Sequence, residues 1–402
     1  MIASLALWSL LTGCGTTTAP PVSEKKALKA NWRGDGEACG PGLSRGEADQ
    51  SLALGRAFML NNQWPAGNFA YEYDWRAKSD SKDDNEVRQA GATWGMGLML
   101  HDAPDDAEVR DALLKALDFW DQQAVDEAGR RYLFYKGAEK GSTGMIALVA
   151  LAHIELLRSG AELSPERRAK VQTDLTGLLA TIRAQRADDG GFFSYYRKNL
   201  TPYRKPNPYA DGEAVLALTK AAKYTGHTER FDEVVGWVKK DYVRNVANAR
   251  DKDPDSDTTK GYYQWSSMTW FELANSDVAG KGPWEDWLME LAVWMIDTHR
   301  TLKRTRNTSY AYEGIIPAYE TARKKGDPRE AKFRCVIDQG MRKLTSWQLG
   351  HPLAVSYVSK ADPADTRGRG GIQNIHNEPG LRIDVTQHQM HAVILHRRYV
   401  AK

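Results

Sequence analysis

Apolar and polar positions along this chain form two helical patterns that alternate. One pattern consists of small apolar residues with few charges, as in "GSTGMIALVALAHIELL" at 141–157. The other places apolar residues three and four positions apart among charged ones, as in "AEVRDALLKALDFWDQQ" at 107–123. The second pattern is typical of a helix with one solvent-facing side, whereas the first is typical of a buried helix. The chain therefore predicts alternating buried and half-exposed helices.

Each buried helix follows a half-exposed one, and the pair occurs six times. The predicted buried helices span 87–100, 141–157, 211–226, 266–274, 309–326 and 384–398. The predicted half-exposed helices span 45–62, 107–123, 165–185, 228–244, 284–300 and 328–347. Because repeated helical pairs bury their apolar sides against each other, six of them predict an all-α closed ring with the buried helices inside. An open helical solenoid is the alternative.

Three turns resemble those of a known superfamily. "AQRADDGGFFSYY", "NNQWPAGNFAYEY" and, more loosely, "SWQLGH" before "RGRGGI" each follow a half-exposed helix with a Gln and a Gly-containing turn. They resemble the Q-x-x-x-G-G-F-type turns of (α/α)6 toroids, a superfamily that includes terpenoid cyclases and six-hairpin glycosidases. The resemblance implies a single (α/α)6 toroid domain over 44–402. It specifies a fold and leaves the reaction open.

The N-terminus resembles a bacterial lipoprotein signal. Residues 1–14, "MIASLALWSLLTGC", hold an apolar stretch that is too short for a permanent transmembrane helix and ends in a Cys. The resemblance implies that Cys14 is lipidated, and Gly15 after it implies outer-membrane sorting, with the body facing the periplasm. One departure is that no Lys or Arg precedes the apolar stretch. Residues 15–43 predict a flexible tether.

Composition argues against some classes of partner. The chain has 55 Lys and Arg against 52 Asp and Glu, a formal charge of +3, so we expect no nucleic-acid partner. It contains no Gly-rich phosphate loop, and we expect no cofactor. Apart from Cys14, the only cysteines are Cys39 and Cys335, which either form a disulfide or stay as two thiols. A closed ring would place them on the same side.

The loops that lead into the predicted inner helices are long and basic. Residues 186–208 carry five Arg or Lys against two Asp, and residues 300–308 carry four basic residues and no acid. These loops lie at the N-termini of the inner helices, where unpaired N–H groups add positive charge. We therefore expect the site at this end of the ring, with a preference for anionic ligands, although a merely solvated charged surface is the alternative.

Two glutamates occupy matching positions in the third and fifth repeats. Glu213 and Glu313 each lie thirteen residues before the glycine that ends the helix, Gly226 and Gly326. We predict that the two carboxylates face each other across the pocket as the acid/base pair of a glycosidase. The alternative is that each stabilises its own helix N-terminus.

The last predicted inner helix carries a second polar cluster. In "LRIDVTQHQMH", Asp384, His388 and His391 share one helical face. Three interpretations stay open: a polar wall, a proton-transfer site in which Asp384 orients His388, and a metal site. Because a bare H-x-x-H spacing is a weak metal signal, we expect no metal. Asp211 and Asp384 are the second choices for the catalytic carboxylates.

Other polar and aromatic residues near the helix starts have simpler predicted roles. Residues expected to cap helix N-termini are Ser142, Ser266, Ser309 and Asp211. Residues expected to contact substrate are Arg88, Gln89, Tyr209, Trp270, Tyr310, Tyr312 and Gln387.

Together these features predict a lipid-anchored enzyme that hydrolyses a poly- or oligosaccharide. The basic loops favour an anionic substrate, such as one that contains uronic acids. A polysaccharide lyase or uronate epimerase is the first alternative, with Tyr312 or His388 as base and Arg88 as neutralising group. A non-catalytic lipoprotein that binds glycan or a protein partner is the second.

Overall fold

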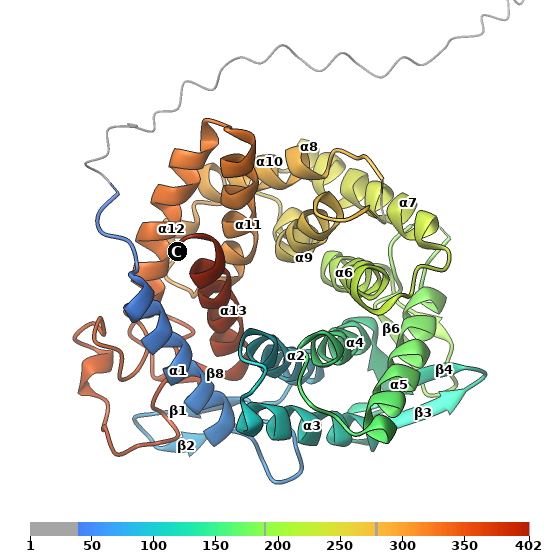
Figure 1. Cartoon of the computed structure of the whole chain (residues 1–402), viewed down its shortest axis with the longest axis horizontal. Helices are drawn as coiled ribbons and strands as arrows, with labels where there is room; N and C mark the ends of the chain where they lie inside the picture. Colours follow the sequence, from blue (N-terminus) through green and yellow to red (C-terminus); the bar gives the residue numbers. More distant parts are fainter. Residues whose placement is uncertain (1–38, 189, 278–279, 402) are drawn as a thin grey trace, which may run out of the picture. The chain divides into compact units, whose positions relative to one another are not determined.

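The computed structural model describes residues 39–188, 190–277 and 280–401. Helices form two concentric rings in this part of the chain (Figure 1). The inner ring consists of α2 (Glu86–Asp102), α4 (Thr143–Arg158), α6 (Pro208–Thr225), α9 (Asp257–Ala274), α11 (Ser309–Lys325) and α13 (Ile383–Tyr399). The outer ring consists of α1 (Arg45–Asn61), α3 (Ala107–Asp121), α5 (Pro165–Ala184), α7 (Phe231–Tyr242), α10 (Trp284–Asp297) and α12 (Arg329–Thr345). A short helix, α8 (Asn248–Lys252), lies between α7 and α9.

The inner ring is closed. Each inner helix packs on the next one along the chain, and α13 packs back on α2 as well as on α1 (Figure 1). The predicted all-α (α/α)6 toroid is therefore confirmed, and the open solenoid is wrong. The main difference from the predicted helices is that α9 begins at Asp257 rather than at residue 266.

Glycines set the close approach of neighbouring inner helices. A Cβ atom on Gly212 of α6 would lie 2.4 Å from the Cβ of Trp265 on α9. A Cβ atom on Gly95 of α2 would lie 2.4 Å from the Cγ of Gln387 on α13. Because such distances are far below carbon contact distances, a larger residue would force the helices apart.

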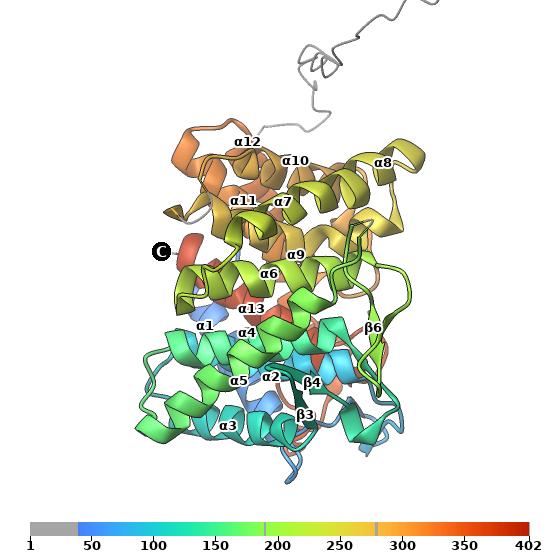
Figure 2. The same cartoon turned by 90° about the vertical axis from the view of Figure 1, so that its right-hand side faces the viewer.

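The eight strands found among the described residues all lie in connections from an outer helix to the next inner helix. The strands are β1 (Glu72–Asp74), β2 (Ser79–Asp80), β3 (Ala124–Glu127), β4 (Arg130–Leu133), β5 (Lys140–Ser142), β6 (Tyr195–Arg197), β7 (Pro202–Tyr203) and β8 (Gly380–Arg382). They form small antiparallel sheets in the orders β2-β1-β8, β3-β4 and β5-β6-β7. Figure 2 shows β6 at one end of the ring and the C-terminus at the other.

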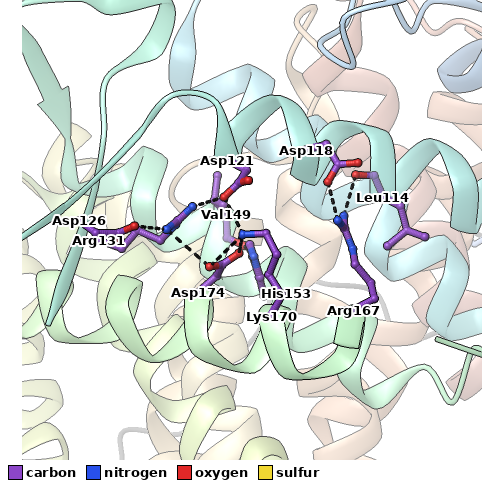
Figure 3. A network of polar contacts seen from close by, with 10 residues as sticks. All are labelled: Leu114, Asp118, Asp121, Asp126, Arg131, Val149, His153, Arg167, Lys170 and Asp174. Carbon is purple, nitrogen blue, oxygen red and sulfur yellow. Dashed lines mark hydrogen bonds and ion pairs between the residues drawn. The ribbon is translucent and has the colours of Figure 1, made fainter. Parts of the chain in front are cut away.

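Polar contacts around Arg131 fix the β3–β4 hairpin on the outer ring (Figure 3). Arg131 of β4 pairs with Asp126 of β3 at 2.6 Å, with Asp121 of α3, and with Asp174 of α5 at 3.5 Å. Lys170 of α5 bonds to Asp121 at 2.8 Å and to Asp174 at 3.0 Å. Since the Arg131 side chain is only 10% exposed, these carboxylates compensate its positive charge. The network holds α3, α5 and the hairpin together.

Cys39 and Cys335 form a disulfide, which settles the alternative left open by the sequence. Cys335 belongs to α12 and Cys39 precedes α1, so the bond joins the start of the ring to its last outer helix. The predicted signal sequence, Cys14 and the tether up to residue 38 lie outside the described residues. Within the described ranges, no helix has the length and apolarity needed to cross a membrane.

The expected N-caps are only partly correct. Ser142 caps α4 by accepting a hydrogen bond from a backbone N–H. Ser266 does not cap α9, because that helix begins earlier and Ser256 is its cap. Ser309 is the first residue of α11 and follows the cap position, which Thr308 occupies.

We predict that Gly212→Ala lowers the free energy of unfolding by about 1–3 kcal/mol, since the added methyl group has no room beside Trp265. Gly236→Ala in α7 is the matched control, because a Cβ there meets no atom within 4 Å. That variant should be neutral or more stable by up to about 1 kcal/mol, as alanine favours helix. Urea unfolding followed by circular dichroism measures both. Equal stabilities of the two variants would contradict the packing argument.

Candidate active site

A cavity of about 470 Å³ opens at the N-terminal end of the inner ring. We call it the front cavity. Its wall includes Asn85, Ser142 and Asn207, the residues that cap α2, α4 and α6. Side chains from α9 and α13 complete the wall. The cavity therefore lies at the end of the ring that the long basic loops predict.

The front cavity brings together about half of the predicted site residues. Those that line it are Arg88, Tyr209, Glu213, Asp384, Gln387 and His388. It also holds Tyr195, Gln264 and Trp265, which the sequence reasoning did not select. Trp265 was missed because the predicted helix began one residue after it. Tyr195 belongs to the 186–208 loop. The aromatic and basic composition of that loop indicated that it borders the site, but not which of its aromatic side chains lines the cavity.

The buried carboxylate of Glu313 orients two histidines of α13. Glu313 is fully buried, and its Oε1 accepts hydrogen bonds from His388 Nδ1 at 3.2 Å and from His391 Nδ1 at 2.8 Å. A carboxylate can only accept here, so both Nδ1 atoms carry the proton. His388 lines the front cavity, and Nε2 is the ring nitrogen that does not bond to Glu313. Burial alone would lower the pKa of His388, but the charge of Glu313 and the hydrogen bond to it raise that pKa overall.

The predicted pair of facing carboxylates does not form. Glu313 lies behind His388 and is not part of the wall of the front cavity. Burial would raise the pKa of Glu313, yet the two histidines hold it below its usual value. Glu313 is therefore an ionised partner of His388. The equal spacing of Glu213 and Glu313 from their helix-ending glycines correctly placed both on inner helices. It did not show that only Glu213 of the two lines the front cavity.

Glu213 lies in the cavity wall, where its side chain is almost completely shielded from solvent. It is 3% exposed, and its carboxylate packs against α4 at Gly144, where a Cβ atom would lie 2.1 Å from Glu213 Oε2. Burial raises the pKa of Glu213 to about 8, with the positive charge of His388 opposing and the negative charge of Asp211 adding to the shift. Glu213 is therefore a protonated acid at neutral pH.

Asp384 is the second carboxyl group in the wall, and its environment is the opposite. Arg88 Nε donates to Asp384 Oδ2 at 3.0 Å, and Arg382 Nε donates to Oδ1 at 3.0 Å. Burial would raise the pKa of Asp384, but these two arginines lower it overall. The front cavity thus contains one protonated and one ionised carboxyl group.

Asp211 supports the wall from behind. Since Asn207 caps α6, Asp211 lies inside the helix and the expected cap role is wrong. Asp211 accepts hydrogen bonds from the Phe192 N–H at 2.8 Å, from Asn245 Nδ2 at 2.9 Å and from Arg244. These bonds attach the 186–208 loop and the segment after α7 to the inner helix that carries Glu213.

Two predicted substrate contacts lie beside the cavity and have other partners. Gln89 bonds to both the N–H and the carbonyl of Phe69, at 2.9 and 2.8 Å, and so holds the loop between α1 and α2. Tyr310 is partly buried and its hydroxyl lies 3.4 Å from His299 Nε2. Neither residue is part of the cavity wall.

Two further predicted contacts point away from the ring axis, toward the outer helices. Tyr312 is buried against α12, where a Cβ atom on Gly340 would collide with its hydroxyl. Trp270 is fully buried and packs against Trp287 of α10, with ring centroids 5.5 Å apart. Both were expected near the substrate because they lie on inner helices. Their rotation about the helix axis places them in the core between the rings instead.

His391 faces a second, smaller cavity of about 200 Å³, formed at the C-terminal ends of the inner helices. Glu313 thus bonds to two histidines, and each of them lines a different cavity. The Nδ1 atoms of His388 and His391 both bond to Glu313 Oε1, so neither of these atoms is free to bind a metal ion. Among the described residues, no group of three or more His, Cys, Asp and Glu side chains is placed to hold a metal ion.

No protein-family model matches the sequence, and no curated protein matches it either. Solved structures do match the fold. A cellobiose 2-epimerase from Bacillus thermoamylovorans has a TM-score of 0.62 at 10% identity, over 87% of this chain and 98% of that one. A D-mannose isomerase has a TM-score of 0.57 at 12% identity, over 87% and 96%.

A further match is an α-1,6-mannanase of family GH76 from Salegentibacter, in complex with α-1,6-mannotetrose. Its TM-score is 0.56 at 12% identity, over 89% of this chain and 99% of that one. At such identities the likeness establishes the fold and not the reaction. The chain is an (α/α)6 toroid with a cavity at the N-terminal end of its inner helices, lined by charged, polar and aromatic side chains.

Proposed function

We propose that the protein is a carbohydrate-active enzyme that moves a proton on a sugar, as an epimerase or an isomerase does, with His388 as the proton-transfer group. The single observation that supports this most is the bond from His388 Nδ1 to the buried, ionised Glu313. A carboxylate behind an imidazole fixes its tautomer and stabilises its charged form. Nε2 is then presented to the cavity as a base.

Glu213 is the matching acid. Its carboxyl group is protonated at neutral pH, because burial raises its pKa to about 8. A protonated carboxyl in a dry wall can donate a hydrogen bond to an oxygen on which negative charge develops. Arg88 lies in the same wall and adds positive charge, although it also pairs with Asp384.

The proposed reaction needs no atoms beyond those of the sugar and the two groups. His388 Nε2 takes the proton from the carbon next to the carbonyl of an open-chain sugar, and the electron pair moves into the carbonyl. Glu213 protonates the carbonyl oxygen, which gives an enediol. The enediol then turns over in the cavity, His388 returns its proton to the same carbon on the other face, and Glu213 takes back the proton of the former carbonyl oxygen, which gives the epimer. If His388 instead returns the proton to the former carbonyl carbon, Glu213 takes the proton of the neighbouring hydroxyl and the product is the ketose.

Aromatic side chains in the wall suit a sugar. Trp265, Tyr195 and Tyr209 line the cavity, and flat rings of this kind pack against sugar faces. Among the structures that share the fold are a sugar epimerase, a cellobiose 2-epimerase, a D-mannose isomerase and a mannanase. They support the choice of carbohydrate as the substrate class. The outer-membrane address and lipidation at Cys14 stay predictions from the sequence.

Glycosidic hydrolysis is a second candidate because the wall contains a protonated and an ionised carboxyl group. Glu213 would protonate the leaving oxygen and Asp384 would activate water or attack the sugar. Two features disfavour this mechanism. Both oxygens of Asp384 are already bonded to arginines. In the mannanase of the same fold, the variant in which two adjacent aspartates are replaced by alanine is inactive. Glu213 and Asp384, in contrast, belong to different helices.

We expect the enzyme to exchange the C2 hydrogen of a reducing sugar with solvent. Mannose, cellobiose and other aldoses would be incubated in D2O, and loss of the C2 proton signal followed by NMR. His388→Asn should slow the exchange by about 10²–10⁴-fold, since it removes the base. His227→Asn is the control, as His227 lies outside the front cavity and its side chain bonds to Thr176 and Thr225.

The outcomes of this assay separate the candidates. Release of reducing ends from mannotetraose without C2 exchange, lost in Glu213→Gln and Asp384→Asn, would favour hydrolysis. Exchange that persists in His388→Asn would contradict the role of His388.

We expect a bell-shaped dependence of kcat/KM on pH. Activity should rise as His388 loses its proton, at a pKa above the usual value, and should fall as Glu213 ionises near pH 8. Glu213→Gln cannot ionise, so it should be about 100-fold slower but lack the falling limb. Measuring the C2 exchange rate between about pH 5 and pH 10 tests this. An unchanged falling limb in Glu213→Gln would assign that limb to another group.

A further inference from the structure

A small sheet beside the front cavity presents one open face. It consists of β5, β6 and β7, which connect neighbouring outer and inner helices. Side chains alternate along β6, so Tyr195 and Arg197 point to one face and Tyr196 to the other. Tyr196 is fully buried, and its hydroxyl donates to the Leu133 carbonyl at 2.7 Å. The opposite face, with Tyr195 and Arg197, is the open one.

Two tyrosine rings and three cations share this open face. Tyr195 lies opposite Tyr203 across the strands, with ring centroids 5.9 Å apart. Lys140 Nζ lies 4.5 Å from the centre of the Tyr195 ring and Arg204 lies 5.2 Å from it. Arg197 lies 4.4 Å from the centre of the Tyr203 ring. We call these five residues the tyrosine platform.

The cations of the tyrosine platform have no carboxylate partner within the described part of the chain. The nearby acid, Glu139, pairs with Lys198 at 3.0 Å instead. Lys140 and Arg197 are also direct cross-strand neighbours, an arrangement of like charges that destabilises a sheet. An anion bound between them would relieve this repulsion.

The platform continues into the front cavity. Tyr195 and Ser142 belong to its sheet and also line the cavity wall. A chain of sugars bound with one unit beside His388 would therefore extend over the Tyr195 ring. Rings supply stacking surface for sugars, and the flanking cations supply charge.

We propose that the tyrosine platform binds an acidic oligosaccharide, whose carboxylate or sulfate groups pair with Lys140, Arg197 and Arg204 while its sugar rings stack on Tyr195 and Tyr203. This inference rests on the proposed function, since it names the class of carbohydrate that reaches the same cavity. The competing explanation is that the cations only stabilise the hairpin by resting on the tyrosine rings.

Two substitutions separate binding from stability. Arg204 has a φ of +63°, a conformation that favours glycine, so Arg204→Gly should not lower stability. Lys140→Thr removes one of the two like charges and adds a residue that favours strands, so it too should leave stability equal or higher. Lys198→Thr is the matched control, because Lys198 adjoins Arg197 in the same hairpin but pairs with Glu139.

The test is calorimetric titration of the full chain with acidic tetrasaccharides. One arm uses galacturonate or mannuronate tetramers, a second uses a sulfated tetramer, and a third uses the same tetramers with their carboxyls reduced. At least one acidic form should bind about tenfold or more tightly than its neutral counterpart. Lys140→Thr and Arg204→Gly should each weaken that binding about fivefold, and Lys198→Thr should leave it unchanged.

Two results would overturn the proposal. They are equal binding of neutral and acidic tetramers, and unchanged affinity in Lys140→Thr and Arg204→Gly. The titration measures binding and not turnover, so its result is independent of whether the proposed proton transfer takes place. A chain that binds acidic sugars but exchanges no C2 hydrogen would refute only the proton transfer.

Discussion

The site depends on the hydrogen bonds between the buried, ionised carboxylate of Glu313 and two histidines. A carboxylate without water is costly unless donors surround it. Here His388 and His391 donate to the same oxygen, and each thereby acquires a fixed ring orientation. One imidazole is directed to the front cavity and the other to the cavity at the opposite end. The proposed proton transfer at His388 rests on this arrangement.

The toroid explains why the other groups gather around His388. Inner helices approach closely where they carry glycine, and their N-terminal ends converge on one opening. Glu213 packs on Gly144 of the neighbouring helix, which leaves its carboxyl group dry and raises its pKa. Asp384, in contrast, stays ionised between two arginines. Neighbouring helices therefore give two carboxyl groups opposite protonation states within one cavity.

The sequence predicted the ring and the end of the ring that holds the cavity, because both depend on periodicity and on loop composition. It could not predict how each helix is rotated about its axis. Tyr312 and Glu313 are adjacent in sequence, yet one packs on α12 and the other bonds to α13. Equal spacing likewise placed Glu213 and Glu313 on inner helices without showing that His388 lies in front of Glu313. Trp265 was lost through an error in where α9 begins.

The central claim is that Glu313 controls the protonation of His388, and NMR titration of isotope-labelled histidine tests it most directly. The His388 signal would be assigned by its absence in His388→Asn and then followed with pH in the wild type and in Glu313→Gln. We predict that His388 titrates above its usual pKa in the wild type and below it in Glu313→Gln, since burial remains when the charge is removed. The same pKa in both proteins would contradict the account.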